Sequence, residues 1–418
     1  MVAPDKATAK YLAQHAAGET AAASLIQRTY EHCLVIPACR ESAAGVKRVW
    51  QHLGSDCLII LIINTGSAED SQTRELWRDL SGESPDNAPW VLRQDPGQPD
   101  RLLINRWHDD LLIPVRQGVG LARKTGADIA LALISEGRIR KPLIHTTDAD
   151  VILPADYFDQ ISKLDKDTAA WIYRFRHTAD ESLRLESLLY DVSMHYYVRG
   201  LRLAGSGYAF FSIGSTLVVS AAHYARVHGF PRRSAGEDFY LLNKLAKTGQ
   251  IEPLSGEPVS IQARLSDRVP FGTGPALRSI AALPSPLQDY RFYHPETFRA
   301  LAALIRLMPE FLDPGRSVTA ADPFWLAPWL EQSGFLQAMQ TSSQIRLTAS
   351  HWQQFCHEWF DGFRTLKFIH FMRDNYYPSQ PLSSICETEF LPVAAPENPT
   401  DLERLLEQIA AENTEPAR

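Results

Sequence analysis

The feature that most constrains the fold of this chain is a set of short, continuously apolar runs separated by stretches with helical patterning. The longest purely apolar run extends from Cys57 to Ile63, and shorter ones occupy residues 33–37 and 102–104. Strands that are apolar at every position are buried on both faces, which is typical of parallel sheets covered by helices. The sequence therefore predicts an α/β fold with a mainly parallel, Rossmann-like sheet and helices on both faces.

Further strands are expected at residues 142–154, 169–175 and 211–220, and a helix at 118–132. The first of these strands ends in two carboxylates, Asp148 and Asp150. Ligands of open α/β sheets bind at the carboxyl ends of the strands. We therefore expect both aspartates at the mouth of a crevice.

The 418 residues are 45% hydrophobic and 22% charged, as in ordinary globular proteins, and the length suggests two or three structural units. We expect an N-terminal helical segment over 1–30, with helices at 7–15 and 20–30, and an α/β domain over 31–285. The pattern then becomes helical, Trp-rich and Pro-punctuated, which predicts a helical C-terminal domain over 286–418. Its last helix is expected after a capping box at Thr400–Glu403. Packing or homo-oligomer formation is the expected role of the C-terminal helices.

Charge and residue usage exclude several classes. The net charge of −7 gives no basic field for nucleic acid. The apolar runs are far below the roughly 20 residues of a transmembrane helix, and no basic-then-apolar leader is present, so a cytoplasmic protein is expected. The five cysteines contain no CxxC pair, and the histidines contain no HExxH motif, which argues against a zinc site.

The pair Asp148-Ala-Asp150 is the first candidate site. Along an extended strand its carboxylates are about 7 Å apart on one face. Mg²⁺ and Mn²⁺ bind through one or two carboxylates together with substrate phosphates, which is what a nucleotide-diphosphate site requires. The alternative is a solvated strand end or turn, because such pairs also occur by chance.

The second candidate is Asp238, in a helix expected to begin at Gly236. The helix dipole favours its anion, whereas a dry cleft would raise its pKa toward that of a useful base. Acidic residues also occur in first helical turns for stability alone, so both interpretations remain open.

Two Gly-containing segments are candidates for binding a phosphate. Arg264 and Arg268 precede a loop, 269–274, whose glycines would allow close approach to a phosphate, with an ordinary surface turn as the alternative. Gly118-Val-Gly120 begins like a dinucleotide fingerprint, but Arg123 stands where the third glycine belongs and the strand follows instead of preceding it. It is therefore not a Rossmann motif.

Taken in order, these features resemble family 2-like glycosyltransferases of the GT-A fold over residues 31–275. The opening strand and acidic loop are Val35-Ile-Pro-Ala-Cys-Arg-Glu41, and the second strand ends in Asn64-Thr-Gly-Ser67. The remaining matches are Gly118-x-x-x-Ala-Arg-Lys124, Thr147-Asp-Ala-Asp150, and Gly229-Phe-Pro with Gly236-Glu-Asp238.

The resemblance implies a nucleotide-diphosphate sugar donor and a hydroxyl acceptor, small or peripheral. Mn²⁺ or Mg²⁺ would be held by Asp150 and Asp148. The implied donor-binding residues are Pro37, Glu41, Asn64, Arg123, Lys124, Asp148 and Arg268, and the implied catalytic residues are Glu237 and Asp238. Asp238 as base would invert the configuration, and the sequence leaves a retaining route open. Cys39, Arg40, Asn64 and Lys124 depart from the family pattern and bear on nucleotide preference.

The predicted function is therefore a metal-dependent hexosyltransferase. A sugar-phosphate nucleotidyltransferase would need an N-terminal Gly-rich loop, which the segment 35–41 lacks. A non-catalytic nucleotide-sugar-binding protein of the same fold is the other alternative. The aromatic segment 190–211, which includes His195, is either part of the acceptor region or core packing.

Overall fold

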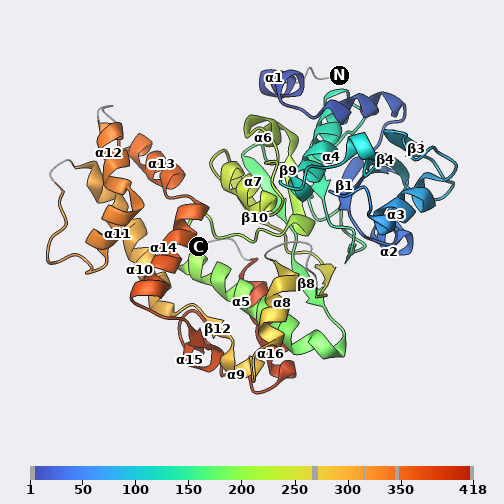
Figure 1. Cartoon of the computed structure of the whole chain (residues 1–418). Coiled ribbons are helices and arrows are strands. Elements are labelled where there is room, and N and C mark those ends of the chain that lie inside the picture. Colours follow the sequence, from blue (N-terminus) through green and yellow to red (C-terminus); the bar gives the residue numbers. More distant parts are fainter. Residues whose placement is uncertain (1–4, 266–271, 314–315, 344–347, 415–418) are drawn as a thin grey trace. The chain divides into compact units, whose positions relative to one another are not determined.

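A computed structural model describes residues 5–265, 272–313, 316–343 and 348–414 (Figure 1). The chain forms two compact units. The first comprises the residues up to Leu183 together with Ser212–Arg278, and the second comprises Arg184–Phe211 together with the residues from Ser279 onward. Each unit is therefore assembled from two separate stretches of sequence.

The first unit is built on an eight-stranded sheet in the order β10-β7-β9-β5-β1-β2-β4-β3. The strands are β1 His32–Ala38, β2 Cys57–Asn64, β3 Trp90–Arg93, β4 Asp100–Arg106, β5 Leu143–Thr146, β7 Thr168–Ile172, β9 Leu217–Ser220 and β10 Gln250–Pro253. Only β3 and β9 run against their neighbours, so six of these eight strands share one direction. The expected mainly parallel sheet is confirmed.

Helices cover both faces of this sheet. All eight residues of β2 are buried, as its continuous apolar sequence requires. Helix α4 (Gly118–Ser135) packs closely on β1 and β2. The packing requires a glycine at position 126, since a Cβ there would collide with Val35 and lie 2.5 Å from Ile62. Right-handed crossovers place α2 (Ala43–Trp50) and α3 (Ser71–Ser81) on the opposite face.

The other helices of the first unit are short. They are α1 Lys6–Gln14, η1 Gly18–Leu25, η2 Asp109–Leu111, η3 Glu181–Leu183, η4 Gly214–Thr216, α6 Ala221–Arg226 and α7 Glu237–Leu245. Helix α8 (Thr273–Ala281) crosses the boundary between the two units. The expected helix at 20–30 is a 3₁₀ helix over Gly18–Leu25 instead, with hydrogen bonds of three-residue spacing such as Ile26 N–H to the carbonyl of Ala23.

Several predicted strands are broken where the chain changes sheets. The predicted strand at 142–154 is divided into β5 and β6 (Val151–Ile152). The predicted strand at 169–175 is divided in the same way, since β7 ends at Ile172 and β8 (Phe175–Thr178) begins at Phe175. Strands β6 and β8 join β11 (Val259–Gln262) in a separate three-stranded sheet. The predicted strand at 211–220 retains only its last four residues as β9, because η4 precedes it. Apolar periodicity does not reveal such breaks, since the residues next to them, such as Thr146 and Val151, are buried on both sides.

The second unit is mainly helical, as expected for the C-terminal region. Its elements are α5 Arg184–Leu203, α9 Pro286–Asp289, β12 Arg291–Phe292, α10 Pro295–Leu307, η5 Met308–Leu312, α11 Leu326–Ser333, α12 Phe335–Ser343, α13 Ala349–Trp359, α14 Gly362–Asn375, β13 Gln380–Pro381, α15 Leu382–Ile385 and α16 Pro399–Glu412. Trp325, Trp329 and Trp352 are buried in its core. Helix α16 begins after Asn398, whose side chain accepts from the N–H of Asp401, so the cap precedes the predicted capping box.

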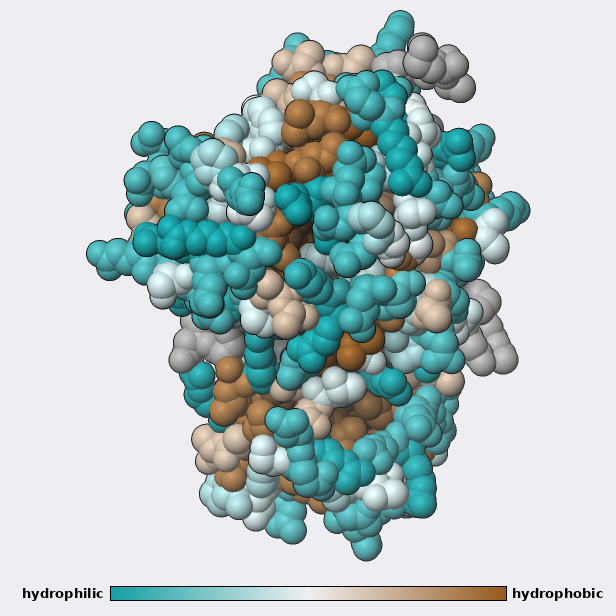
Figure 2. Space-filling view, turned by 90° about the vertical axis from the view of Figure 1, so that its right-hand side faces the viewer, coloured by the Kyte–Doolittle hydropathy of each residue, from teal (hydrophilic) through white to brown (hydrophobic). Residues whose placement is uncertain are grey.

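Hydrophilic residues cover most of the face seen in Figure 2, with hydrophobic areas between them. Among the described residues, no helix combines the length and the apolar character needed to cross a membrane.

Candidate functional site

The segment with the two aspartates lies at a turn that links the two sheets of the first unit. Strand β5 ends at Thr146, and β6 begins at Val151 in the smaller sheet. Thr147 donates a hydrogen bond from Oγ1 to the carbonyl of Ser215, 2.8 Å away, and so fixes the turn. The side chain of Asp148 is 37% exposed and that of Asp150 is 20% exposed. Both carboxylates are therefore at the carboxyl end of β5, as predicted, and accessible to a ligand.

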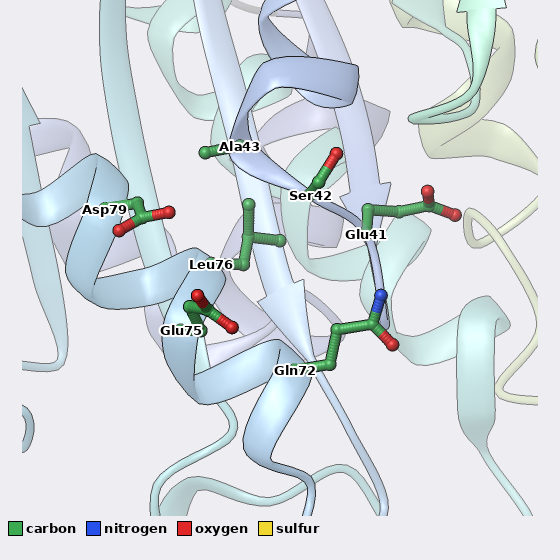
Figure 3. A pocket seen from close by; sticks show the side chains of 7 residues that line it. All are labelled: Glu41, Ser42, Ala43, Gln72, Glu75, Leu76 and Asp79. Carbon is green, nitrogen blue, oxygen red and sulfur yellow. The ribbon is translucent and has the colours of Figure 1, made fainter.

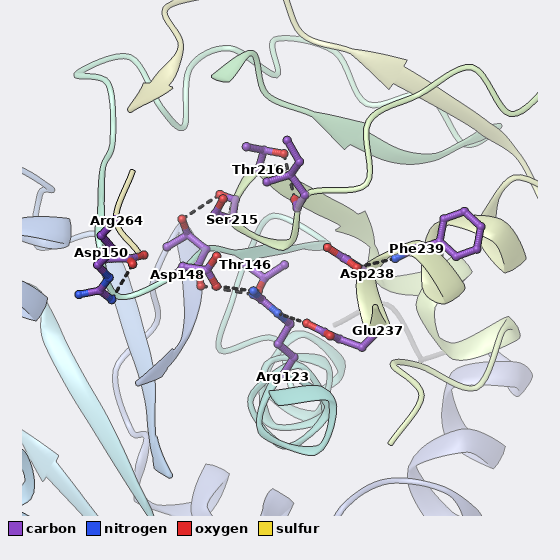
Figure 4. Close-up of polar contacts among 12 residues, drawn as sticks. Arg123, Thr146, Asp148, Asp150, Ser215, Thr216, Glu237, Asp238, Phe239 and Arg264 are labelled. Carbon is purple, nitrogen blue, oxygen red and sulfur yellow. Dashed lines mark hydrogen bonds and ion pairs between the residues drawn. The ribbon is translucent and has the colours of Figure 1, made fainter. Parts of the chain in front are cut away.

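Arg123 on α4 joins this turn to the start of α7 (Figure 4). Its side chain is only 3% exposed, and its Nε donates to Glu237 Oε1 at 2.8 Å. Nη2 contacts the carboxylate of Asp148, and Nη1 donates to Thr146 Oγ1 at 2.7 Å. Burial acts to lower the pKa of Arg123, but the carboxylates of Asp148, Glu237 and Asp238 outweigh it and raise the pKa. Arg123 is thus a permanent buried cation whose donors are directed at protein oxygens.

Asp238 lies in the first turn of α7, directly after Glu237. Gly236 has φ +70°, which glycine adopts without strain, and it serves as the N-cap of the helix. The N–H of Phe239 donates to Asp238 Oδ1 at 2.7 Å. Burial, followed by the neighbouring charge of Glu237, raises the pKa of Asp238 to about 7. A carboxyl group in this state exchanges a proton near neutral pH, as a general base must.

Two glycines of the segment Gly118-Val-Gly120 allow the loop before α7 to pass over the start of α4. A Cβ at Gly120 would lie 2.5 Å from the carbonyl oxygen of Pro231 and 2.6 Å from that of Arg233. The N–H of Gly120 donates to the same Arg233 carbonyl at 2.9 Å. These glycines are therefore explained by loop packing that positions Glu237 and Asp238.

Arg264, which follows β11, contacts two of the predicted site residues. Its guanidinium contacts the carboxylate of Glu41, and its Nη2 donates to Asp150 Oδ2 at 2.8 Å. Arg264 is not among the site residues that the sequence predicts. Its position next to Arg268 before a Gly-containing loop was the available signal. Arg268 itself lies outside the described residues.

The other predicted site residues lie in different surroundings. Pro37 and Asn64 are buried in neighbouring strands, β1 and β2, near their carboxyl ends. Asn64 Oδ1 is a buried acceptor with no hydrogen-bond partner among the described residues. Lys124 is not brought to the aspartates, because its Nζ lies 3.0 Å from Asp128 Oδ2 in a separate buried cluster with Tyr11. Neighbouring positions on a helix point about 100° apart, so Arg123 and Lys124 serve different sites.

A cavity of about 140 Å³ lies beside Glu41, between α2 and α3. Its lining residues are Glu41, Ser42, Ala43, Gln72, Glu75, Leu76 and Asp79. In Figure 3 the carboxylate of Glu41 points away from those of Glu75 and Asp79. Within the part of the chain that the structure describes, no group of three or more His, Cys, Asp or Glu side chains could enclose a metal ion.

Comparisons with known proteins gave structural likenesses alone. No protein-family model and no curated protein matches the sequence. S. aureus TarS in complex with UDP-GlcNAc aligns over 78% of this chain and 89% of its own, with 11% identity and a TM-score of 0.36. The mannosyltransferase PcManGT from Pyrobaculum calidifontis, in complex with GDP-Man and Mn²⁺, aligns over 88% and 98%, with 14% identity and a TM-score of 0.36. Likenesses of this size do not identify a reaction.

Proposed function

We propose that the first unit is the catalytic part of a glycosyltransferase that moves a hexose from a nucleoside-diphosphate sugar to an acceptor hydroxyl. One observation carries the proposal: a single buried arginine, Arg123, links Asp148 of the Asp148-Ala-Asp150 turn to Glu237, beside a carboxyl, Asp238, with a pKa of about 7. The shared contact of these carboxylates with Arg123 supports a site at the carboxyl end of the sheet that combines cation-binding oxygens with a base.

The carboxylates fit a divalent cation that is shared with a diphosphate. Asp148 and Asp150 supply hard oxygen ligands, and one or two carboxylates with substrate phosphates are the usual set for Mg²⁺ or Mn²⁺. The lack of a larger ligand cluster in the described ranges agrees with such a shared site and not with an all-protein cage. When bound, the cation would stabilise negative charge that develops on the leaving diphosphate.

Asp238 would act as the base. The acceptor oxygen attacks the anomeric carbon, the bond from that carbon to the phosphate oxygen breaks, and the diphosphate leaves with the electron pair. The proton of the acceptor hydroxyl passes to a carboxylate oxygen of Asp238. A direct displacement of this kind inverts the anomeric configuration. The raised pKa supports this role, because a base works best when its pKa is near the working pH.

Arg123 and Glu237 would be positioning residues. The donors of Arg123 point at protein oxygens, so its charge holds Asp148 and Glu237 in place and counters the negative charge around Asp238. Pro37, Glu41 and Asn64 would border the nucleoside, and the unpartnered acceptor of Asn64 supports a ligand N–H there. Arg268 would contact the diphosphate of the donor.

The test combines binding and turnover. We would titrate UDP and GDP, with and without Mn²⁺, by calorimetry on the wild type and on Asp150→Ala, with Arg78→Gln as a control at an exposed ion pair. We expect one nucleotide to bind with Mn²⁺ dependence that only Asp150→Ala removes.

We would also measure the rate at which the nucleoside diphosphate is released from its sugar in the presence of hydroxyl acceptors. This rate should fall by about 10²–10⁴-fold in Asp238→Asn, whereas the affinity for the donor should stay unchanged. Binding without turnover would favour the non-catalytic alternative, and binding of neither nucleotide would contradict the proposed donor site.

A further inference from the structure

Arg264 contacts Asp150, one of the two carboxylates proposed to hold a cation. Its Nη2 donates to Asp150 Oδ2 at 2.8 Å and also contacts Glu41 Oε1, and its Nη1 donates to Glu41 Oε2 at 3.3 Å. Figure 4 shows the pair of Arg264 and Asp150 apart from the cluster around Arg123. One guanidinium thus neutralises part of the charge of two carboxylates that come from distant parts of the sequence.

The local backbone holds Arg264 at this point. Strand β11 pairs with β6, and the N–H of Gln262 donates to the carbonyl of Asp150 at 3.4 Å. The Arg264 side chain is 35% exposed, so it can exchange partners without opening the core. Its Nε is a buried donor with no hydrogen-bond partner among the described residues. An unsatisfied buried N–H on a guanidinium favours an additional anionic oxygen as a partner.

We propose that Arg264 competes with a divalent cation for Asp150 and gives up that carboxylate only when a diphosphate arrives with the cation. The inference rests on the proposed function. A cation alone would meet the guanidinium at Asp150 and be repelled by its charge. A diphosphate would remove this obstacle, because its oxygens can accept the guanidinium donors of Arg264. Asp150 would then be available to hold the cation together with the phosphates. The cation therefore binds poorly alone and binds together with the nucleotide.

Binding of Mn²⁺ alone tests the competition directly. Free Mn²⁺ is measured by electron paramagnetic resonance, without nucleotide, in the wild type and in Arg264→Gln, Arg264→Lys and Arg78→Gln. We expect Arg264→Gln to bind Mn²⁺ on the order of tenfold more tightly, since the competing charge is gone. Arg264→Lys keeps the charge and should stay close to the wild type, as should Arg78→Gln, which removes an exposed ion pair elsewhere in the same unit. Adding Asp150→Asn to Arg264→Gln should abolish the gain.

Equal Mn²⁺ affinity in Arg264→Gln and the wild type would overturn the inference, and so would a gain that survives Asp150→Asn. Nucleotide titrations separate this outcome from failure of the proposed function. If UDP or GDP binds the wild type with Mn²⁺ but Arg264→Gln gains no Mn²⁺ affinity, the inference fails and the donor site stands. If Arg264→Gln gains Mn²⁺ affinity at Asp150 but no nucleotide binds any variant, the competition stands and the proposed donor site fails.

Discussion

Asp238 and Glu237 are adjacent acidic residues, but the fold gives their carboxyl groups different surroundings and therefore different protonation behaviour. Glu237 is buried and paired with Arg123, whereas burial and the charge of Glu237 raise the pKa of Asp238 to about 7. A base must be ionised to accept a proton, so kcat/KM for sugar transfer should rise with pH through about 7 and then level off. In Glu237→Gln the rising limb should move to lower pH, because the nearby negative charge is lost.

The measurement is a pH–rate profile of both proteins with saturating metal. Far-ultraviolet circular dichroism confirms folding, since loss of one partner of a buried ion pair costs about 3–5 kcal/mol. An unchanged limb, or one displaced to higher pH, would show that Asp238 does not set it.

The burial of His145 in β5 leads us to expect that the stability of the protein falls in acid. His145 is fully buried, and burial, followed by the neighbouring His32, holds its pKa well below the usual value of 6.5. Below pH about 6.5 His145 is therefore protonated in the unfolded chain but stays neutral in the folded chain. This linkage lowers the free energy of unfolding by about 1.4 kcal/mol per pH unit.

We expect His145→Gln to lose less stability between pH 7 and pH 5 than the wild type, as measured by urea unfolding at each pH. The quantity compared is the slope with pH, because the substitution also changes packing. The exposed His52 offers a matched control, His52→Gln, which should keep the wild-type slope. Equal slopes in all three proteins would contradict the assignment.

At the scale of elements, the loop over the start of α4 positions the acidic pair of α7. Gly120→Ala would place a Cβ 2.5 Å from the Pro231 carbonyl oxygen, and backbone must shift to accommodate it. Because a displacement of about 1 Å can cost 10²-fold in rate, we expect kcat to fall by about that factor while the nucleotide affinity changes little. Gly54→Ala is the control, since its Cβ would meet nothing within 4 Å. Comparable kcat values in both variants would exclude a positioning role for the loop.

Asp128 on α4 is a buried anchor for the N-terminal segment. Its carboxylate accepts from Tyr11 of α1 at 2.7 Å, from Tyr224 of α6 at 2.8 Å and from the N–H of Ala17 at 2.8 Å, and it pairs with Lys124. Asp128→Asn would leave the buried ammonium unpaired at a cost of about 3–5 kcal/mol.

We expect limited proteolysis of Asp128→Asn to release the first 25 or so residues sooner than in the wild type. Glu136→Gln, at an exposed position after the same helix, should be cleaved like the wild type. Cleavage that starts elsewhere in Asp128→Asn would contradict the anchoring role.

At the scale of the whole molecule, the chain leaves the first unit at α5 and returns to it at Ser212. Helix α16 packs on α5, with Leu402, Leu405 and Ile409 buried in the core of the second unit. Leu405→Asp would bury a charge there, at a cost of about 3–5 kcal/mol. Hydrogen exchange should then show lost protection in α5 and α16 and retained protection in β1 and β2. Gln408→Asp, on the exposed side of α16, should leave both regions protected, and equal losses in the two units would show that they unfold as one.

The sequence alone identified the central buried strands of the sheet, because a strand buried on both faces must be apolar throughout. This is why the predicted run at Cys57–Asn64 coincides with β2 and why the carboxylates after β5 were expected at the strand end. Linear patterns could not show where a buried run changes sheets, as it does between β5 and β6, or that α5 packs with the C-terminal helices.

Charge partners were decided by tertiary structure alone. Arg123 and Lys124 are adjacent in sequence, yet one contacts Asp148 and the other Asp128, because a helix turns them toward different neighbours. Arg264 meets Glu41 over a separation of 223 residues, and it meets Asp150 over 114 residues, where β11 pairs with β6. Hydrophobic burial is repeated along each element and can be read locally, whereas an ion pair depends on two side chains whose proximity only the folded backbone determines.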